Sequence, residues 1–161
     1  MSSPIDELDA RLLALLDAEP RVSVLEIARR LSVARGTVQA RLDRMRRTGV
    51  VRGFGPVVDP AALGYPVTAF CTLEISQGGG HDAVARHLAA IPEVLEVHTI
   101  TGPGDLLVRV VARSNRDLQR VIDRVVADDG VLRTSTAIAL HDQLPHRTMP
   151  LVRVAADPAP R

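Results

Sequence analysis

The chain has 161 residues, of which 46% are hydrophobic and 24% are charged. This composition is typical of a globular protein, and the length suffices for one large domain or two small ones. All 20 basic residues are arginines and the formal net charge is only +1. These two facts exclude a Schiff-base lysine, a phosphate-loop lysine and a strong attraction of the whole molecule to nucleic acid.

Motifs of several other protein classes are missing from the sequence. The single cysteine, Cys71, excludes an intramolecular disulfide and a cysteine-based zinc site. No apolar run reaches membrane-spanning length, and the first residues lead into acidic side chains, so we expect a cytoplasmic protein without a signal peptide or a membrane partner. Because no nucleophile elbow, metal cluster or phosphate loop occurs, we predict no catalytic residue, no metal and no cofactor.

The chain begins with two predicted helices. The first covers residues 6–17 and has Asp6 as its cap. Its apolar face carries Leu8, Leu12, Leu15 and Leu16. The second begins at Ser23, which forms a capping box with Glu26. Apolar residues then recur at helical spacing at Leu25, Ala28 and Leu31, with Ile27 alongside.

A third helix follows a turn at residues 32–34 and ends at Gly49, a residue suited to a left-handed C-cap. A helix, a tight turn and a basic helix form the helix-turn-helix that places a recognition helix in the DNA major groove. Its exposed face mixes Arg with Thr and Gln, so we expect its first residues to read base edges and its later arginines to meet phosphates. The predicted contacts to double-stranded DNA are Ser23, Arg35, Gly36, Thr37, Gln39, Arg41, Arg44 and Arg47.

The distribution of charge supports this prediction more than the total does. Residues 1–53 contain ten arginines and seven acidic residues, a net charge of +3, whereas the remainder of the chain has a net charge of −2. A basic excess confined to the predicted helix-turn-helix is typical of a DNA-binding domain.

The sequence of residues 54–66 indicates a connecting arm. Short runs of β-forming residues at 50–54 and 57–58 surround Gly55 and Pro56, which is consistent with an extended arm or a small hairpin. The run from Asp59 to Pro66 is rich in residues that favour turns.

Residues 67–142 alternate between strand and helix patterns. Strands are predicted at 67–76, 94–101, 105–112 and 131–140, helices at 82–91 and 114–127, and the glycines at 78–80 end the first strand. The turn Gly102-Pro103-Gly104 is so short that the second and third strands must form a hairpin. The order βαββαβ is that of the ferredoxin-like sandwich.

The predicted fold class is therefore α+β, with an N-terminal trihelical helix-turn-helix domain at 1–53, a β-arm and linker at 54–66, and a C-terminal ferredoxin-like βαββαβ sandwich at 67–142. Residues 143–161 carry prolines and apolar residues without a clear period. We predict that this C-terminal tail is largely disordered.

Several short motifs occur in a fixed order along the chain: Ile5–Leu13, Glu26–Ala28 with Thr37–Met45, Gly49–Phe54 with Asp59-Pro60 and Leu63-Gly64, and Thr101–Leu107. In this order they resemble the opening L-D-x-x-D-x-x-I-L, the helix-turn-helix, the connecting strand with its linker, and the G-x-x-D turn of the Lrp/AsnC family of bacterial transcription regulators. The resemblance covers nearly the whole chain. The sequence departs from the family pattern in the helix-turn-helix, where Ser32 replaces the usual turn glycine and Ala34 replaces the usual cap.

The resemblance implies a transcriptional regulator whose ferredoxin-like half binds an effector and forms homodimers, which assemble further, typically into octamers. A small effector, usually an amino acid, would bind between dimers. Such a site is physically reasonable, because a turn with two glycines exposes N–H groups to a carboxylate and a nearby Asp can hold an ammonium group, although a hairpin turn alone favours the same residue types. The matching effector positions are Thr101, Gly102, Pro103, Gly104, Asp105, Thr134 and Thr136.

Two alternatives compete with this interpretation. Some proteins of the same two-part architecture are decarboxylases of haem precursors, and such an enzyme requires His or Tyr in a pocket, for which His98 and His141 are the strand candidates. A lone strand histidine is more often structural. A module that oligomerises without contacting DNA requires that the Arg-rich face be incidental. The regulator accounts for more of the sequence than either.

Overall fold

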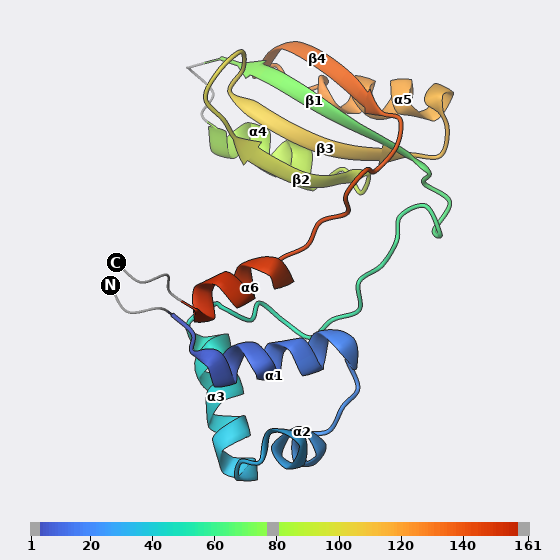
Figure 1. The fold of residues 1–161 in the computed structure, drawn as a ribbon. Coiled ribbons are helices and arrows are strands. Elements are labelled where there is room, and N and C mark those ends of the chain that lie inside the picture. The colour runs from blue at the N-terminus through green and yellow to red at the C-terminus, as the bar shows by residue number, and fades with distance from the viewer. Residues whose placement is uncertain (1–3, 77–80, 158–161) are drawn as a thin grey trace. The chain divides into compact units, whose positions relative to one another are not determined.

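The computed structural model describes residues 4–76 and 81–157 (Figure 1). The chain divides into two compact units, the first formed by residues 1–56 with 144–161 and the second by residues 57–143. The division after Pro56 falls within the predicted arm at 54–66. The glycines at 78–80 and the last four residues lie outside the described residues. No helix in the described ranges is long and apolar enough to span a membrane.

The first unit contains three of the predicted helices: α1 (Glu7–Ala18), α2 (Val24–Leu31) and α3 (Arg35–Arg47). Their bounds lie close to those that the sequence predicts. The three helices bury one shared apolar cluster, in which α3 contributes the face that its periodicity indicates. The buried members are Ile5, Leu12, Ile27, Ala28, Leu31, Val38, Leu42 and Met45.

The helix ends explain where each helix begins and stops. Asp6 and Asp9 form a reciprocal capping box at the start of α1. The turn between α2 and α3 passes through Ser32, whose φ of 55° is left-handed, although the family usually places glycine there. Ala34 gives α3 no side-chain cap. Gly49 has a φ of 77°, as expected for a residue that follows the end of a helix.

Two predictions about α2 are wrong. Leu25 is 67% exposed, and Ile27 takes the buried position instead, because the two helices flanking α2 cover the Ile27 and Leu31 side of it. The Ser23 hydroxyl accepts a hydrogen bond from the Glu26 N–H, but the Glu26 carboxylate does not complete the box. It accepts hydrogen bonds from Arg29 and Arg30 instead, which lower its pKa to about 2.

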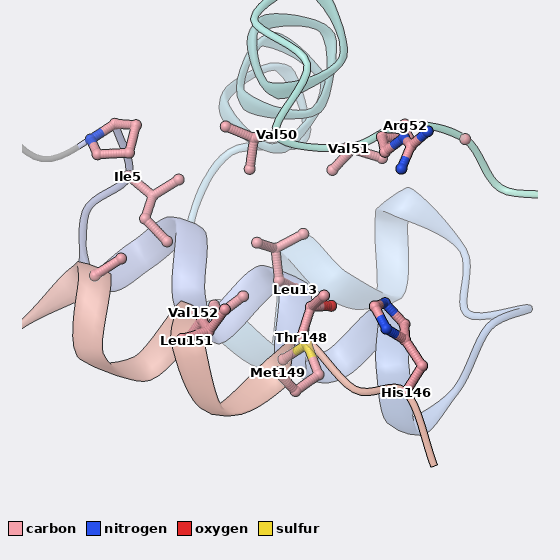
Figure 2. Close-up of a pocket in the computed structure, with 13 residues that line it drawn as sticks. Ile5, Leu13, Val50, Val51, Arg52, His146, Thr148, Met149, Leu151 and Val152 are labelled. Atoms are coloured by element: carbon pink, nitrogen blue, oxygen red, sulfur yellow. The ribbon is translucent and has the colours of Figure 1, made fainter. Parts of the chain in front are cut away.

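The prediction of a largely disordered tail is wrong for residues 149–156, which form helix α6 (Met149–Ala156). Helix α6 lies alongside α1 and packs Val152, Ala155 and Ala156 against the cluster of the first unit (Figure 2). These three residues have helical spacing, and the proline in the first turn suits a helix start. The pattern is only two turns long, which is too short to show a clear period in the sequence.

The predicted β segments at 50–58 are also wrong, because no strand is assigned between α3 and residue 67. The β-forming residues here are largely exposed, with Val57 and Val58 among them, and no strand of the described chain pairs with them. A strand requires a partner for its backbone hydrogen bonds, whatever its sequence favours. Residues 60–64 form the predicted turn, with Gly64 at a φ of 89°.

The second unit has the predicted order β1 (Val67–Ile75), α4 (His81–Ala89), β2 (Val94–Thr99), β3 (Leu106–Ala112), α5 (Asn115–Val125) and β4 (Val131–Ala139). The strands form one antiparallel sheet in the order β2-β3-β1-β4. The sheet is a ferredoxin-like one, and β2 and β3 form the predicted hairpin.

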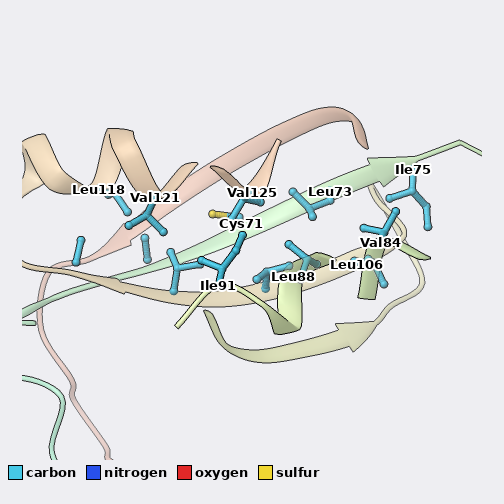
Figure 3. Close-up of a cluster of buried hydrophobic side chains, with 14 residues drawn as sticks. Cys71, Leu73, Ile75, Val84, Leu88, Ile91, Leu106, Leu118, Val121 and Val125 are labelled. Carbon is cyan, nitrogen blue, oxygen red and sulfur yellow. The ribbon is translucent and has the colours of Figure 1, made fainter. Parts of the chain in front are cut away.

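Both helices of this unit cover the same face of the sheet (Figure 3). Alternate residues of β1 point into the resulting core, Cys71 and Leu73 among them, and burial raises the pKa of the Cys71 thiol. The alternating residues Phe70 and Thr72 belong to the opposite face, on which no helix of the described chain packs. This uncovered face therefore includes an apolar side chain, because Phe70 is 39% exposed.

Candidate functional site

The predicted base-reading residues lie together on the exposed side of α3. Arg35, Gly36, Thr37 and Gln39 occupy its first turns and are all exposed, while Val38 and Leu42 on the opposite side are buried in the core. The side-chain amide of Gln39 donates a hydrogen bond to Asp43, one turn further on. This arrangement leaves the N-terminal half of α3 free to approach a base edge.

Two of the predicted phosphate-binding arginines are held by α1 instead of projecting freely. Arg41 donates hydrogen bonds to Asp6 at 2.6 and 2.7 Å and to Asp9 at 2.9 Å, and Arg44 also donates to Asp9. The Asp9 side chain has no exposed surface. The hydrogen bond from Arg41 is the main reason why the pKa of Asp6 lies below its ordinary value. These pairs fix α3 against the start of α1.

The sequence pattern assigns Asp6 only to the cap of α1, and Asp9 to no role beyond that first turn. The signal that could have revealed their second role is the pair of acidic residues three positions apart, together with two arginines on α3 that are also three apart. A buried carboxylate requires charged or hydrogen-bonding partners, and both arginines supply them to Asp9.

The remaining arginines of α3 have different surroundings. The guanidinium of Arg46 lies over the ring of Phe54, 5.5 Å from its centroid. Arg35 and Arg47 are exposed, and within the described residues neither forms an ion pair. Ser23, the predicted contact on α2, is exposed as its N-cap. Arg35 and Arg47 are therefore the arginines of α3 that are exposed with neither an ion-pair partner nor a ring contact in the described ranges.

An open groove runs along α3 beside Gly36. A methyl group added at Gly36 would meet no protein atom within 4 Å, so neither packing nor a positive φ requires glycine at this position. The groove is lined by Asp6, Gly36, Thr37, Ala40, Arg41 and Arg44.

The predicted effector turn is held tightly against the end of β1. The Asp105 N–H donates to the Leu73 carbonyl at 2.8 Å, and the Asp105 carboxylate accepts from the Ile75 N–H at 2.8 Å. A Cβ at Gly104 would lie 2.5 Å from a methyl carbon of Thr72 and 3.0 Å from the Leu73 carbonyl oxygen, so a larger residue here would push the Thr72 side chain aside. Gly102 has a φ of 125°. The predicted turn residues Thr101, Gly102 and Pro103 are exposed.

The two predicted threonines lie on β4 on the helix-covered side of the sheet. Thr134 pairs with Leu73 and Thr136 pairs with Cys71, and the Thr136 hydroxyl donates to the Cys71 sulfur at 3.4 Å. Because Asp105 and Thr134 both flank Leu73, they lie at the same end of the sheet. The Thr134 hydroxyl is buried and has no hydrogen-bond partner within the described residues.

The opposite face of the sheet has a small pocket at this same end, with a volume of about 290 Å³. None of the predicted threonines lines it. Its residues are Thr72, Glu74, Pro103, Arg133 and Ser135.

Comparisons with protein families match both halves of the chain. The model described as a winged helix-turn-helix DNA-binding domain matches residues 5–52. The model described as the Lrp/AsnC ligand binding domain matches residues 68–149.

Among curated proteins, the chain is 31% identical over 140 residues to the HTH-type transcriptional regulator FL11 of Pyrococcus horikoshii, covering 87% of this chain and 92% of that protein. It is 32% identical over 136 residues to an HTH-type transcriptional regulator of Mycobacterium tuberculosis, covering 84% of this chain and 92% of that protein.

Solved structures give the same result. E. coli AsnC matches with a TM-score of 0.82 and 28% identity, covering 91% of this chain and 99% of that chain. A feast or famine regulatory protein from M. tuberculosis complexed with L-methionine matches with a TM-score of 0.78 and 27% identity, covering 89% of this chain and 97% of that chain. The chain therefore belongs to the Lrp/AsnC family of transcriptional regulators, and it combines a helix-turn-helix DNA-binding domain with the ligand-binding domain of that family.

Proposed function

We propose that this regulator recognises a specific sequence of double-stranded DNA through the first turns of α3. The observation that carries the proposal is the exposure of Arg35, Thr37 and Gln39 on one helix whose opposite face is buried. Arg and Gln form bidentate contacts with guanine and adenine edges in the major groove. We propose that Arg47, at the far end of α3, contacts a phosphate.

A mobility-shift titration of the full-length protein tests this proposal. The duplex upstream of its own gene is compared with a shuffled duplex of the same length and composition, at one fixed salt concentration. We expect retardation of the upstream duplex at a protein concentration at least tenfold lower. Equal retardation of both duplexes would contradict sequence-specific recognition.

We further propose that an amino acid binds at the end of the sheet formed by the 101–105 turn and β4. The support is chemical: the Asp105 carboxylate can attract an ammonium group, and the Thr134 hydroxyl is buried without a partner in the described part of the chain. A buried unsatisfied hydroxyl costs about 1–3 kcal/mol, which a ligand that bonds to it would offset. The methionine-bound relative makes L-methionine the first probe.

Two conservative variants separate ligand binding from structure at this site. Asp105→Asn keeps an oxygen that can accept from the Ile75 N–H but removes the charge, and Thr134→Val removes only the hydroxyl. We expect both to weaken amino-acid binding in calorimetry with a panel of amino acids that includes methionine, while Thr134→Val unfolds at a temperature no lower than wild type. Ser135→Ala, on the other face of the sheet, is the control. Unchanged binding in both variants would exclude this site.

We propose that the protein acts as a homodimer or a higher homo-oligomer and has no catalytic role. The curated relatives are named transcriptional regulators, which favours a regulator over a decarboxylase of the same architecture. A two-fold dimer would place two copies of α3 on two DNA half-sites.

A further inference from the structure

The first unit contains a cavity that neither the DNA contacts nor the effector site uses. It has a volume of about 520 Å³ and lies between the segment after α3, the start of the chain with α1, and helix α6 (Figure 2). All its lining residues belong to the first unit. This volume is within the range of small-molecule sites in proteins.

In the described ranges, the lining is mostly aliphatic, with two basic side chains. Most of the wall is aliphatic and includes Ile5, Leu13 and Val152. Among the described residues of the lining, the ionisable ones are Arg52 and His146, and none is acidic. Figure 2 shows both at the same end of the cavity, with the His146 ring directed into the space below Val51 and Arg52.

We propose that this cavity is a second ligand site, which binds a small aliphatic carboxylic acid. The aliphatic chain would lie against Ile5, Leu13 and Val152, where it leaves water. The carboxylate would lie at the other end, where Arg52 offers a charged fork of N–H donors and His146 offers an N–H in either protonation state. A cationic ligand is disfavoured, because in the described part of the lining it would meet Arg52 and His146 and no carboxylate.

The position of the cavity gives such a ligand a regulatory role. Helix α6 forms one wall and the segment 50–53 forms another, and these two segments lead along the chain toward residues 57–143. A ligand that contacts both would hold α6 and the segment 50–53 against α1, and it would stabilise that state by an amount that grows with the logarithm of its concentration above its dissociation constant. This effect is independent of the amino-acid site, whose residues belong to the second unit.

Calorimetry on the full-length protein with two probes tests the proposal. Octanoate and octan-1-ol have the same chain length and differ in the charged headgroup. We expect octanoate to bind at least tenfold more tightly than octan-1-ol, and its addition to shift the methyl resonances of Ile5, Leu13 and Val152 in ¹³C spectra. Equal binding of the two probes, no binding of octanoate up to millimolar concentration, or shifts confined to residues 57–143 would overturn the proposal.

Matched variants locate the carboxylate. The double variant Arg52→Gln/His146→Gln changes two exposed side chains and should reduce octanoate binding to the level of octan-1-ol. Arg153→Gln is the control, because Arg153 is also on α6 but lines a different groove with Glu7 and Arg11. A double variant that binds octanoate as wild type does would overturn the assignment. The comparison of the two probes on wild type decides the question even if a variant is unstable.

Discussion

The arginines of α3 differ in what they contact, although their spacing in the sequence makes them look equivalent. Arg41 and Arg44 are bound to Asp6 and the buried Asp9, whereas Arg47 is exposed beyond them. The sequence identifies the helix and its basic face. Which of its arginines form ion pairs with α1 depends on how α1 packs on α3, and no local sequence pattern encodes that packing. The prediction that some of Arg41, Arg44 and Arg47 meet phosphates therefore narrows to Arg47.

The first prediction separates these two groups of arginines. Arg47→Ala should lower the slope of log binding constant against log salt by about 1 and leave stability unchanged, because it removes one phosphate contact. Arg44→Ala should instead lower the free energy of unfolding by about 2 kcal/mol, because it removes a partner of a buried carboxylate. Salt titrations of DNA binding and urea unfolding measure the two effects. The account fails if Arg44→Ala is as stable as wild type and changes the salt slope as much as Arg47→Ala does.

Gly36 gives the second prediction at this scale. Glycine inside a helix is about 1 kcal/mol less favourable than alanine, and the space around Gly36 is open. Gly36→Ala should therefore raise the free energy of unfolding by about 1 kcal/mol. If DNA enters the groove beside Gly36, the added methyl group should also weaken DNA binding several-fold, because Gly36 lines that groove. Urea unfolding and a DNA titration test the pair of effects. A variant that gains stability and binds DNA normally would show that DNA does not approach Gly36.

Among the elements, the sequence predicts well those whose apolar residues show a clear period, and it misses helix α6. Helices α1, α3 and α5 and all four strands lie near their predicted bounds, because their apolar residues repeat often enough to reveal one face. Helix α6 has only eight residues, and its three anchoring residues gain burial from α1, more than a hundred positions away. The predicted β segments at 50–58 are wrong for a different reason: their residues favour a strand, but no neighbouring strand in the described chain pairs with them.

The third prediction tests whether α6 is part of the first unit. Val152 packs on the cluster around α1, whereas Val154, two residues later, is 71% exposed. Val152→Asp should lower the free energy of unfolding by about 1–2 kcal/mol through lost burial, and Val154→Asp should leave it unchanged. Urea unfolding followed by circular dichroism compares them. Equal stability of the two variants would mean that α6 does not stabilise this unit.

At the scale of the whole molecule, the sequence predicts the two-part architecture, because its motifs occur in the family order. The proposed effector site is accessible from the sequence only in part. The resemblance to the family points to the turn and both threonines, but the hydrogen bonds that hold Asp105 to β1 follow from the strand order, in which β1 lies between β3 and β4. The uncovered face of the sheet follows from the same order, since both helices lie on the other face.

The fourth prediction is that the uncovered face forms the dimer. Phe70 on this face and Leu95, at the irregularity of β2, are similarly exposed at 39% and 42%. A charge at Phe70 should prevent a partner sheet from packing there, so Phe70→Asp should be monomeric in sedimentation velocity and Leu95→Asp should remain dimeric. A dimeric Phe70→Asp variant would place the interface elsewhere.

The most direct test of the central claim, that α3 reads DNA sequence, is the binding of Gln39→Ala to two duplexes. Dissociation constants of wild type and variant are measured for the duplex upstream of the gene and for a shuffled duplex. We expect the variant to lose about 1–3 kcal/mol of binding free energy on the upstream duplex and far less on the shuffled one, because a bidentate base contact is lost while phosphate contacts remain. Equal losses on both duplexes, or none on either, would contradict the claim.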